Sequence, residues 1–420
     1  MLFSDVVLYH TKGAMGNGAT KAGLVAFRIV GVKSWVEVSE RRLGGNYGLL
    51  AETAGAGVSV LGVVKADAYG HGAEVCAPVL VRAGAEWLGV TDAAEGVTVR
   101  EAVGGQELRV LVMSGLLGEE AEAVVRHSLT PVIWTKQQLE WLAEAAGDSS
   151  LGVHLEIDTG MARQGVAVGD ELRGLLVWLR GQRRIVLDGV MTHFASAEVA
   201  GSAQTLEQQG RFEEAMRLVA EAGLRPAWVH AGNSSTLDNC GDATGPLAWL
   251  RMLAAGCGAR AMVRSGLGLY GYCLPIEGAG GVARVRDGLL PVMTWKTRVI
   301  GVREVGVGET VGYNATFVAE RAMRLALVPV GYADGLRREL SGSNLVAGGW
   351  MMVGGQRAGI VGRVSMNLTV VDVSGIAGVA VGDEVVVLGD GITADDHARL
   401  ARTISYEIVC GVRAASRLVP

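Results

Sequence analysis

The sequence predicts an α/β protein: an N-terminal TIM-like (β/α)8 barrel followed by a mostly β C-terminal domain. From residue 58 onward, eight short apolar runs alternate with stretches whose apolar spacing suits amphipathic helices. Polar residues follow each run, at the strand ends where barrel enzymes build their sites. After about residue 290, alternating β-branched and apolar segments with glycine turns predict strands instead.

These patterns divide the chain into three expected parts. Residues 1–32 form a leader, either disordered or the product of a misplaced start; residues 33–290 form the barrel, and residues 291–420 the β-rich domain. A length of 420 residues agrees with more than one domain, because single cores stop growing at about 250–300 residues.

The predicted barrel strands are short and evenly distributed. They are Val58–Val64, Trp87–Val90, Leu108–Val112, Leu129–Ile133, Leu151–Ile157, Val186–Met191, Ala227–Val229 and Ala259–Val263. Between them, Gln137–Ala146 and Glu207–Ala222 have the spacing of amphipathic helices. A doubly wound sheet is the competing architecture, but it gives no reason for a polar cluster after every strand.

The residues just past these strands are the first candidates for a functional site. They are Lys65, Thr91-Asp92, Ser114-Gly115, Trp134-Thr135, Asp158-Thr159-Gly160, Thr192-His193, Gly232-Asn233-Ser234 and Arg264-Ser265-Gly266.

In the second domain, strands are expected within Leu325–Val330, Gln356–Val373 and Glu384–Leu388. Thr393–Arg402 predicts a helix, because Thr393 suits the N-cap and two aspartates follow in the first turn.

Composition excludes several classes of protein. Hydrophobic residues make up 50% of the chain and charged residues 19%, which argues against disorder. The net charge is −5 and the basic residues are scattered, so we expect small-molecule partners rather than nucleic acid or a membrane surface. No uncharged apolar run approaches the ~18–20 residues of a membrane helix.

Cysteine usage favours a reducing compartment, the cytoplasm. The five cysteines are odd in number, widely spaced and without a C-x-x-C pair, which fits neither a disulfide framework nor a zinc site. They are Cys76, Cys240, Cys257, Cys273 and Cys410. We therefore expect no metal.

Lys65 is the residue with the most specific chemistry. The chain has 32 arginines but six lysines, and Lys65 ends the first predicted barrel strand. A lysine amine can form a Schiff base with an aldehyde cofactor, whereas a guanidinium stays protonated. The alternative is a structural lysine that extends to solvent at the barrel rim. Tyr69, Gly70 and Gly72 favour the first interpretation, because the glycines allow a ligand to approach the backbone.

The segment Lys65–Gly72 resembles the pyridoxal-phosphate lysine motif of the alanine racemase family, of fold type III. The resemblance runs from about residue 33 to 420. Further motifs that match in order are I-D-T-G-M-A-R-Q-G (157–165), M-T-H-F-A (191–195), H-A-G-N-S-S (230–235), V-R-S-G-L-G-L-Y-G (263–271), V-G-Y-N-A-T-F (311–317), V-P-V-G-Y-A-D-G (328–335) and G-R-V-S-M-N (362–367).

The resemblance implies pyridoxal 5'-phosphate as the cofactor, bound through Lys65. Residues 266–271 formally match G-x-G-x-x-G but open no helix, so a dinucleotide site is not indicated. The family instead implies a phosphate cradle and a contact to the pyridine nitrogen. The cradle takes the backbone N–H groups of Gly266 and Leu267 with Tyr69, Ser234 and Tyr406, and the nitrogen contact takes Arg264 supported by His193. Asn233 is a further cofactor-binding residue.

The family also implies two bases that act on opposite faces of one carbon. Lys65 handles the proton of the D-enantiomer, and Tyr313, from the partner subunit, that of the L-enantiomer, so a homodimer with shared sites is implied. A phenol needs a nearby cation to act as a base near neutral pH, and Arg163 matches the residue beside it. Tyr332 and Met366 match residues at the substrate entrance and carboxylate.

Two positions depart from the family pattern. Glu156 stands where many relatives carry a carbamylated lysine that steadies the active-site arginine, and its shorter side chain predicts a looser or water-bridged hold on Arg163. Asn367 stands where an aspartate usually follows the methionine, which leaves broader substrate acceptance open. Neither change removes a base.

The predicted function is that of a cytoplasmic alanine racemase, an isomerase that supplies D-alanine for peptidoglycan and cell wall biogenesis. A serine or broad-spectrum racemase on the same scaffold is the nearest alternative, since a single methylene or hydroxyl changes discrimination by only ~1–3 kcal/mol. A non-catalytic protein that only binds pyridoxal phosphate is the alternative from another class. A related decarboxylase would not need Tyr313 as an opposing base.

Overall fold

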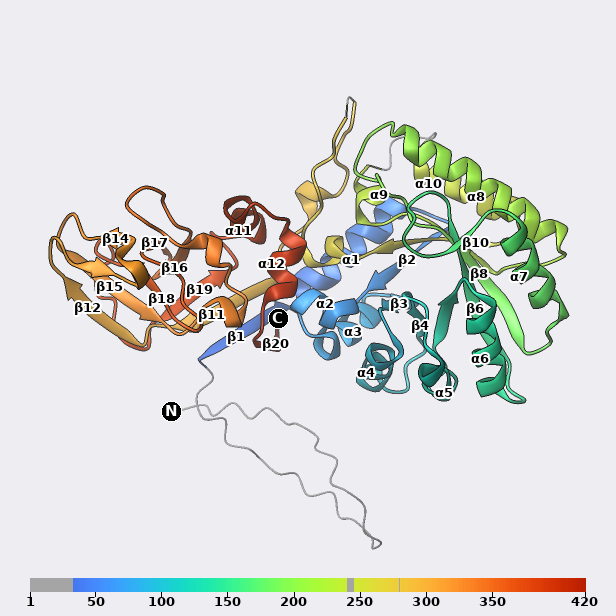
Figure 1. Ribbon diagram of the computed structural model, residues 1–420, viewed down its shortest axis with the longest axis horizontal. Helices are drawn as coiled ribbons and strands as arrows, with labels where there is room; N and C mark the ends of the chain where they lie inside the picture. The colour runs from blue at the N-terminus through green and yellow to red at the C-terminus, as the bar shows by residue number, and fades with distance from the viewer. Residues whose placement is uncertain (1–32, 240–244, 279) are drawn as a thin grey trace, which may run out of the picture.

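The computed structural model describes residues 33–239, 245–278 and 280–420. The expected leader, residues 1–32, and Cys240 lie outside the described residues. The described chain forms a barrel surrounded by helices and, beside it, an elongated β region (Figure 1).

Eight parallel strands form a closed barrel. The order β5-β4-β3-β2-β10-β9-β8-β6 is closed by pairing between β5 and β6. The bounds are β2 (Val58–Val63), β3 (Trp87–Val90), β4 (Arg109–Val112), β5 (Thr130–Ile133), β6 (Leu151–Asp158), β8 (Ile185–Met191), β9 (Trp228–His230) and β10 (Arg260–Ser265), and a short β7 (Val166–Ala167) pairs with β6. The fold class is confirmed, and every predicted strand lies within two residues of an observed one.

Helices cover the outside of the barrel, and two short segments follow β2 and β9 at the C-terminal ends of the strands. They are α1 (Glu40–Ala54), α2 (Lys65–Gly70), α3 (Ala73–Arg82), α4 (Ala93–Val103), α5 (Ala121–Arg126), α6 (Lys136–Ala146), α7 (Asp170–Gly181), α8 (Ala203–Glu221), α9 (Ser234–Asp238) and α10 (Pro246–Gly256). In α6, Leu139, Leu142 and Ala146 are buried at helical spacing. Thr135 and Gln138 close a capping box at its N-terminus.

The second region is built on a nine-stranded sheet of order β12-β15-β18-β17-β16-β19-β11-β1-β20. Its strands are β1 (Ser34–Ser39), β11 (Met293–Arg298), β12 (Gly301–Val305), β15 (Met323–Val328), β16 (Trp350–Val353), β17 (Gln356–Ile360), β18 (Thr369–Asp372), β19 (Glu384–Leu388) and β20 (Ala415–Val419); β13 (Thr310–Val311) and β14 (Phe317–Val318) form a separate ribbon. The helices are α11 (Ala394–Ala401), capped by Thr393 as predicted, and α12 (Ser405–Gly411).

The first strand of the described chain differs from the sequence expectation. We expected residues 33–290 to belong to the barrel, but β1 pairs antiparallel with β11 and parallel with β20 in the second sheet. The chain enters the barrel only at α1, which packs on β2 and α3. The division near residue 290 stays a proposal, with β1 assigned to the second sheet.

The two regions also meet next to α2. Helix α12 packs against α2, and a β-carbon on Gly70 would overlap the carbonyl oxygen of Val409. This close backbone approach lets α12 lie beside α2 (Figure 1). As a result, Tyr406 of α12 and Lys65 line one cavity. Within the described ranges, no helix combines the length and apolar character needed to cross a bilayer.

Candidate active site

A cavity of about 400 Å³ lies at the C-terminal ends of the barrel strands. It contains every residue that the sequence assigned to the cofactor, together with Arg163. Its lining is Val63, Lys65, Tyr69, Met113, Ser114, Glu156, Arg163, Gln164, Met191, His193, Asn233, Ser234, Arg264, Gly266, Leu267 and Tyr406.

Lys65 follows β2 directly and precedes a left-handed turn. Ala66, Asp67, Ala68 and Tyr69 have φ angles of 51°, 52°, 52° and 54°, a conformation that costs non-glycine residues about 1–2 kcal/mol each. Glu95 Oε1 accepts from the backbone N–H of Ala66 at 2.7 Å, and Asp67 Oδ1 accepts from that of Ala73 at 2.7 Å. These hydrogen bonds help to hold the turn, which carries Lys65 and Tyr69 into one cavity.

The Lys65 amine is partly buried and lies in a positive environment. Desolvation lowers its pKa, and the charge of Arg163 lowers it further. A larger fraction of the amine is therefore neutral and nucleophilic near pH 7 than for a lysine in water.

Ser234 and the turn after β10 form a small polar cradle. Ser234 Oγ accepts from the N–H groups of Gly266 at 3.0 Å and Gly268 at 3.1 Å. A β-carbon on Gly266 would overlap the phenol oxygen of Tyr69, so glycine at this position lets the Tyr69 hydroxyl lie against the turn. Hydroxyls and N–H groups around such a space suit a phosphate dianion.

Arg264 is fully enclosed beside this cradle. It donates from Nη1 to His230 Nδ1 at 3.2 Å, and from Nη2 to Thr192 O at 2.8 Å and His193 Nδ1 at 2.9 Å. Desolvation lowers the pKa of Arg264 to about 10, while the nearby Glu156 carboxylate opposes the shift. The guanidinium therefore remains charged at neutral pH.

Glu156 lies against Gln164 rather than against Arg163. Gln164 Nε2 donates to Glu156 Oε2 at 2.5 Å and to Met113 O at 3.0 Å. Among the described residues, Glu156 has a side-chain hydrogen bond to Gln164 and only a through-space charge interaction with Arg163. Burial raises the pKa of Glu156, opposed by Gln164, Arg264 and Arg163. Glu156 therefore acts on both arginines at a distance.

The other three predicted site residues lie on the second region and do not line this cavity. Tyr313, Tyr332 and Met366 are 67%, 45% and 57% exposed. The backbone N–H groups of Tyr332 and Ala333 donate to the carbonyls of Ser365 and Met366.

The segment of Tyr313 joins the same surface. A β-carbon on Gly312, next to Tyr313, would lie 3.2 Å from the backbone nitrogen of Arg363. The loops of Tyr313, Tyr332 and Met366 thus form one exposed surface, separate from the Lys65 cavity of the same chain.

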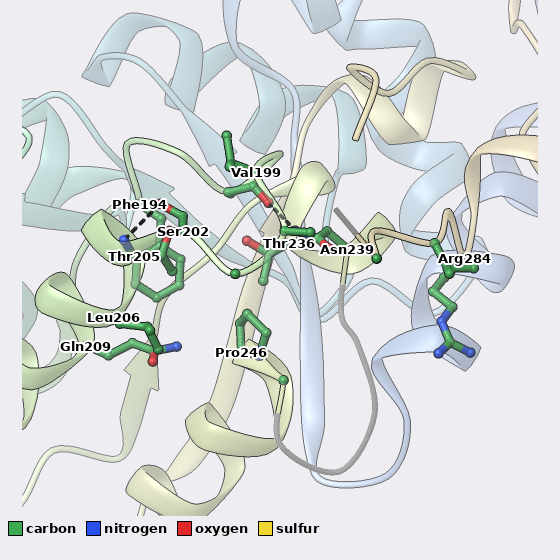
Figure 2. A pocket seen from close by; sticks show the side chains of 16 residues that line it. Phe194, Val199, Ser202, Thr205, Leu206, Gln209, Thr236, Asn239, Pro246 and Arg284 are labelled. Carbon is green, nitrogen blue, oxygen red and sulfur yellow. Dashed lines mark hydrogen bonds between the residues drawn. The ribbon is translucent and has the colours of Figure 1, made fainter. Parts of the chain in front are cut away.

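A second hollow, of about 420 Å³, lies around the start of α8 and α9 (Figure 2). Phe194, Leu206 and Pro246 contribute apolar surface, and Arg284 is the one titratable side chain among its described lining residues. With no amine, imidazole or carboxylate in that described lining, this hollow offers no base or Schiff-base nucleophile. The chemistry is therefore assigned to the Lys65 cavity.

Sequence reasoning missed several residues around the site. Gln164, Met113 and Met191 line the cavity, and His154 and His230 lie behind Arg264. One signal was available: His154 and Glu156 are two residues apart on β6 and therefore share a strand face. The contact between His154 and His230 depends on strand pairing and has no local signal.

Two family models match the chain. The model described as the alanine racemase N-terminal domain matches residues 38–273, and the C-terminal domain model matches residues 292–419. The chain is 37% identical over 385 residues to the alanine racemase of Syntrophobacter fumaroxidans, covering 90% of this chain and 95% of that protein. It is 37% identical over 375 residues to that of Sorangium cellulosum, covering 86% and 90%.

Solved structures give the same relationship. The alanine racemase from Streptomyces coelicolor A3(2) matches with a TM-score of 0.80 and 31% identity, covering 92% of this chain and 98% of that chain. The alanine racemase of Clostridium difficile 630 matches with a TM-score of 0.81 and 28% identity, covering 91% and 94%.

Proposed function

The chain belongs to the alanine racemase family, and from that premise we propose that it interconverts L- and D-alanine with two opposed bases, Lys65 and Tyr313. Racemisation of alanine, an isomerase reaction, is what the relatives' names support. The observation that carries the proposal is the cavity that holds Lys65, Arg264 and the Ser234 cradle together.

The residues present fit pyridoxal 5'-phosphate. The hydroxyls of Tyr69 and Ser234 lie against the Gly266 turn at one edge of the cavity, and this polar edge suits the phosphate. Asn233, Leu267 and Tyr406 line the same cavity, and Lys65 supplies the amine for covalent attachment. When bound, this cofactor supplies the electron sink that acidifies the Cα–H of an amino acid.

Arg264 and His193 would face the pyridine nitrogen. A guanidinium donates a hydrogen bond without giving up its proton, so Arg264 would leave the ring nitrogen unprotonated. A weaker electron sink limits the lifetime of carbanionic species, which favours racemisation over transamination.

Each base serves one face of the substrate. Lys65 takes or returns the Cα proton on the face of the D-enantiomer, and Tyr313 of the partner subunit does so on the face of the L-enantiomer. Support for a homodimer comes from the exposed surface that carries Tyr313, Tyr332 and Met366. None of these three residues lines the Lys65 cavity of its own chain, so a second subunit would have to bring them to it.

The substrate contacts are assigned to Arg163, Tyr332 and Met366. Arg163 would stabilise the phenolate of Tyr313 and the substrate carboxylate, while the other two border the entrance. The amide of Asn367 donates to the Asp334 carboxylate at 3.2 Å. An aspartate at position 367 would place a second negative charge there, so asparagine lowers the charge at this entrance.

We assign the product to peptidoglycan synthesis and the protein to the cytoplasm. Support for the compartment comes from four cysteines of the described chain, which are all unpaired. Serine or broad-spectrum racemisation, and binding of the cofactor without catalysis, are the alternatives.

One experiment separates these functions. The purified protein is incubated in deuterated water with L-alanine, D-alanine or either enantiomer of serine, and the products are resolved by chiral analysis. Deuterated alanine of both hands from either enantiomer, with serine slow, is the expected result. Comparable turnover of serine would identify a broader racemase, and bound cofactor without exchange would identify a non-catalytic protein.

A further inference from the structure

A chain of hydrogen bonds runs behind Arg264 through the interior of the barrel. His230 Nε2 lies 2.8 Å from His154 Nδ1, and His154 Nε2 lies 3.3 Å from Asp188 Oδ2. Arg109 Nη2 donates to the same carboxylate oxygen at 2.7 Å. The side chains of His154 and His230 are completely buried, while Arg109 is 41% exposed. These hydrogen bonds therefore link the enclosed Arg264 to the opposite, solvent-facing end of the barrel.

The hydrogen bonds assign one tautomer to each histidine. The Asp188 carboxylate can only accept, so His154 donates from Nε2 and its Nδ1 accepts from His230 Nε2. His230 Nδ1 is then free to accept from the Arg264 guanidinium, which can only donate. Every bond has one donor and one acceptor only when both imidazoles are neutral. Burial lowers the pKa of His154, and that of His230 well below its usual value.

A strand irregularity makes room for this arrangement. Pairing between β6 and β8 changes from Val153–Leu187 to His154–Gly189, so Asp188 is the extra residue of a β-bulge. Bulges redirect side chains. A β-carbon on Gly189 would lie 2.6 Å from the His154 ring, so glycine is required where the imidazole crosses.

The interior of such barrels is normally filled with branched apolar side chains. Burying two imidazoles there is costly unless their ring nitrogens are paired, as all four are here. At the end away from Asp188, the hydrogen-bond series reaches Arg264. The guanidinium keeps two free N–H donors after its three hydrogen bonds. The polar interior therefore acts on Arg264, whose guanidinium faces the cavity.

We propose that Asp188 and His154 are positioning residues, which act through His230 to fix the plane of the Arg264 guanidinium and to provide negative charge that balances it. This inference rests on the proposed function, since Arg264 is the group assigned to the cofactor ring. Neither residue touches the cavity.

The test compares Asp188→Asn with a matched control. Asparagine can keep an oxygen acceptor for His154 and Arg109 while removing the charge. Glu86 and Arg260 form a similar pair at the same end of the barrel. Arg260 contacts Glu86 at 2.8 Å and lies 4.3 Å from the centre of the Trp228 ring. In the same way, Arg109 contacts Asp188 and lies 4.2 Å from the centre of the Trp87 ring. No hydrogen bond joins Glu86 to a histidine among the described residues, so Glu86→Gln is the control.

Two readouts are measured on the full-length, cofactor-loaded proteins. In the first, imidazole ¹⁵N NMR reports the tautomers of His154 and His230, assigned with single-histidine variants. We expect the Nε2–H form for both in the wild type, altered shifts in Asp188→Asn and unchanged shifts in Glu86→Gln. In the second, the absorption spectrum of the bound cofactor is recorded, and we expect a shift only in Asp188→Asn.

A double-mutant cycle with Arg264→Gln links the readouts to the arginine. We expect Asp188→Asn to lower kcat about tenfold with KM nearly unchanged, a coupling within the range seen for residues of one hydrogen-bond network. It should have no further effect once Arg264 is replaced, and Asp188→Glu, which keeps the charge, should recover part of the loss.

Three results would overturn the inference: Nδ1–H tautomers in the wild type, equal behaviour of Asp188→Asn and Glu86→Gln, or additive effects with Arg264→Gln. Melting curves monitored by circular dichroism confirm that each variant is folded. A wild-type protein that does not racemise alanine would overturn the proposed function instead, while the tautomer result would still test the hydrogen-bond chain.

Discussion

The phenol oxygen of Tyr69 occupies the space in which a β-carbon of residue 266 would stand. Tyr69 reaches this position from the left-handed turn after Lys65, and residue 266 belongs to the turn after β10. Two turns about 200 residues apart in sequence thus border one cradle. Glycine is therefore needed at position 266 because any side chain would collide with Tyr69, and not only because glycine allows more backbone conformations.

Replacing Gly266 by alanine should weaken cofactor binding. Overpacking costs about 1–3 kcal/mol, which corresponds to a roughly 5- to 150-fold increase in Kd, measured by absorbance titration. Gly210→Ala in α8 is the control, because its β-carbon meets nothing within 4 Å. Adding Tyr69→Phe removes the oxygen that clashes and should relieve part of the defect. An unchanged Kd in Gly266→Ala would contradict this account.

Replacing Lys65 by alanine should abolish covalent attachment of the cofactor. Lys65→Arg should do the same, because a guanidinium is a poor nucleophile. The measurement is the visible absorption spectrum after addition of pyridoxal phosphate, with borohydride reduction and mass spectrometry to locate the modified residue. Lys136→Ala is the control, since Lys136 is exposed and pairs with Glu140. A wild-type spectrum in Lys65→Ala would remove the site assignment.

Much of the fold could be predicted because barrel strands leave a local signal. Each strand is a short apolar run followed by polar residues, and the predicted ranges match the eight strands of the barrel closely. By contrast, β1 has the same alternation whichever sheet it joins, so its place between β11 and β20 could not be read from its residues.

The site was predictable to the extent that it follows strand ends and motifs. Lys65, Arg264 and Ser234 line one cavity as expected. The left-handed turn was not predicted, because Ala66 to Tyr69 include no glycine and L-residues rarely adopt positive φ. The Asp188 bulge was also missed, since it is defined by the register between two strands.

Acid should destabilise the protein in part through His397. This imidazole is buried in α11, and burial lowers its pKa from 6.5 to about 4. Between these values the unfolded chain binds the proton more readily, so stability is fully present above pH 6.5 and decreases as pH falls toward 4. The loss from this group is on the order of 3 kcal/mol.

Urea unfolding at pH 7 and pH 5 measures this effect. His397→Gln cannot titrate, so its free energy of unfolding should decrease less between the two pH values than that of the wild type. An equal decrease in both proteins would show that His397 does not contribute.

Replacing Tyr313 by phenylalanine should leave the cofactor bound but slow the reaction. The side chain is 67% exposed in the single chain, so the free energy of unfolding should change by less than about 0.5 kcal/mol. Removal of the hydroxyl eliminates the base that we assign to the L face, so release of the Cα proton should be slowed more from L-alanine than from D-alanine. Deuterium washout from each enantiomer, measured separately, tests this; equal rates would contradict the assignment.

Two inactive variants should restore each other if the site is shared between subunits. In a dimer of Lys65→Ala and Tyr313→Phe chains, one site combines the intact Lys65 of the second chain with the intact Tyr313 of the first, and the other site lacks both groups. Random pairing makes half of the dimers mixed, so co-expression should give about a quarter of the wild-type activity. Differently tagged chains purified through both tags should reach about half. If the mixed dimers are as inactive as the parent proteins, Lys65 and Tyr313 must come from the same chain. In the described chain Tyr313 lies outside the Lys65 cavity. That result would therefore require the second region to move relative to the barrel.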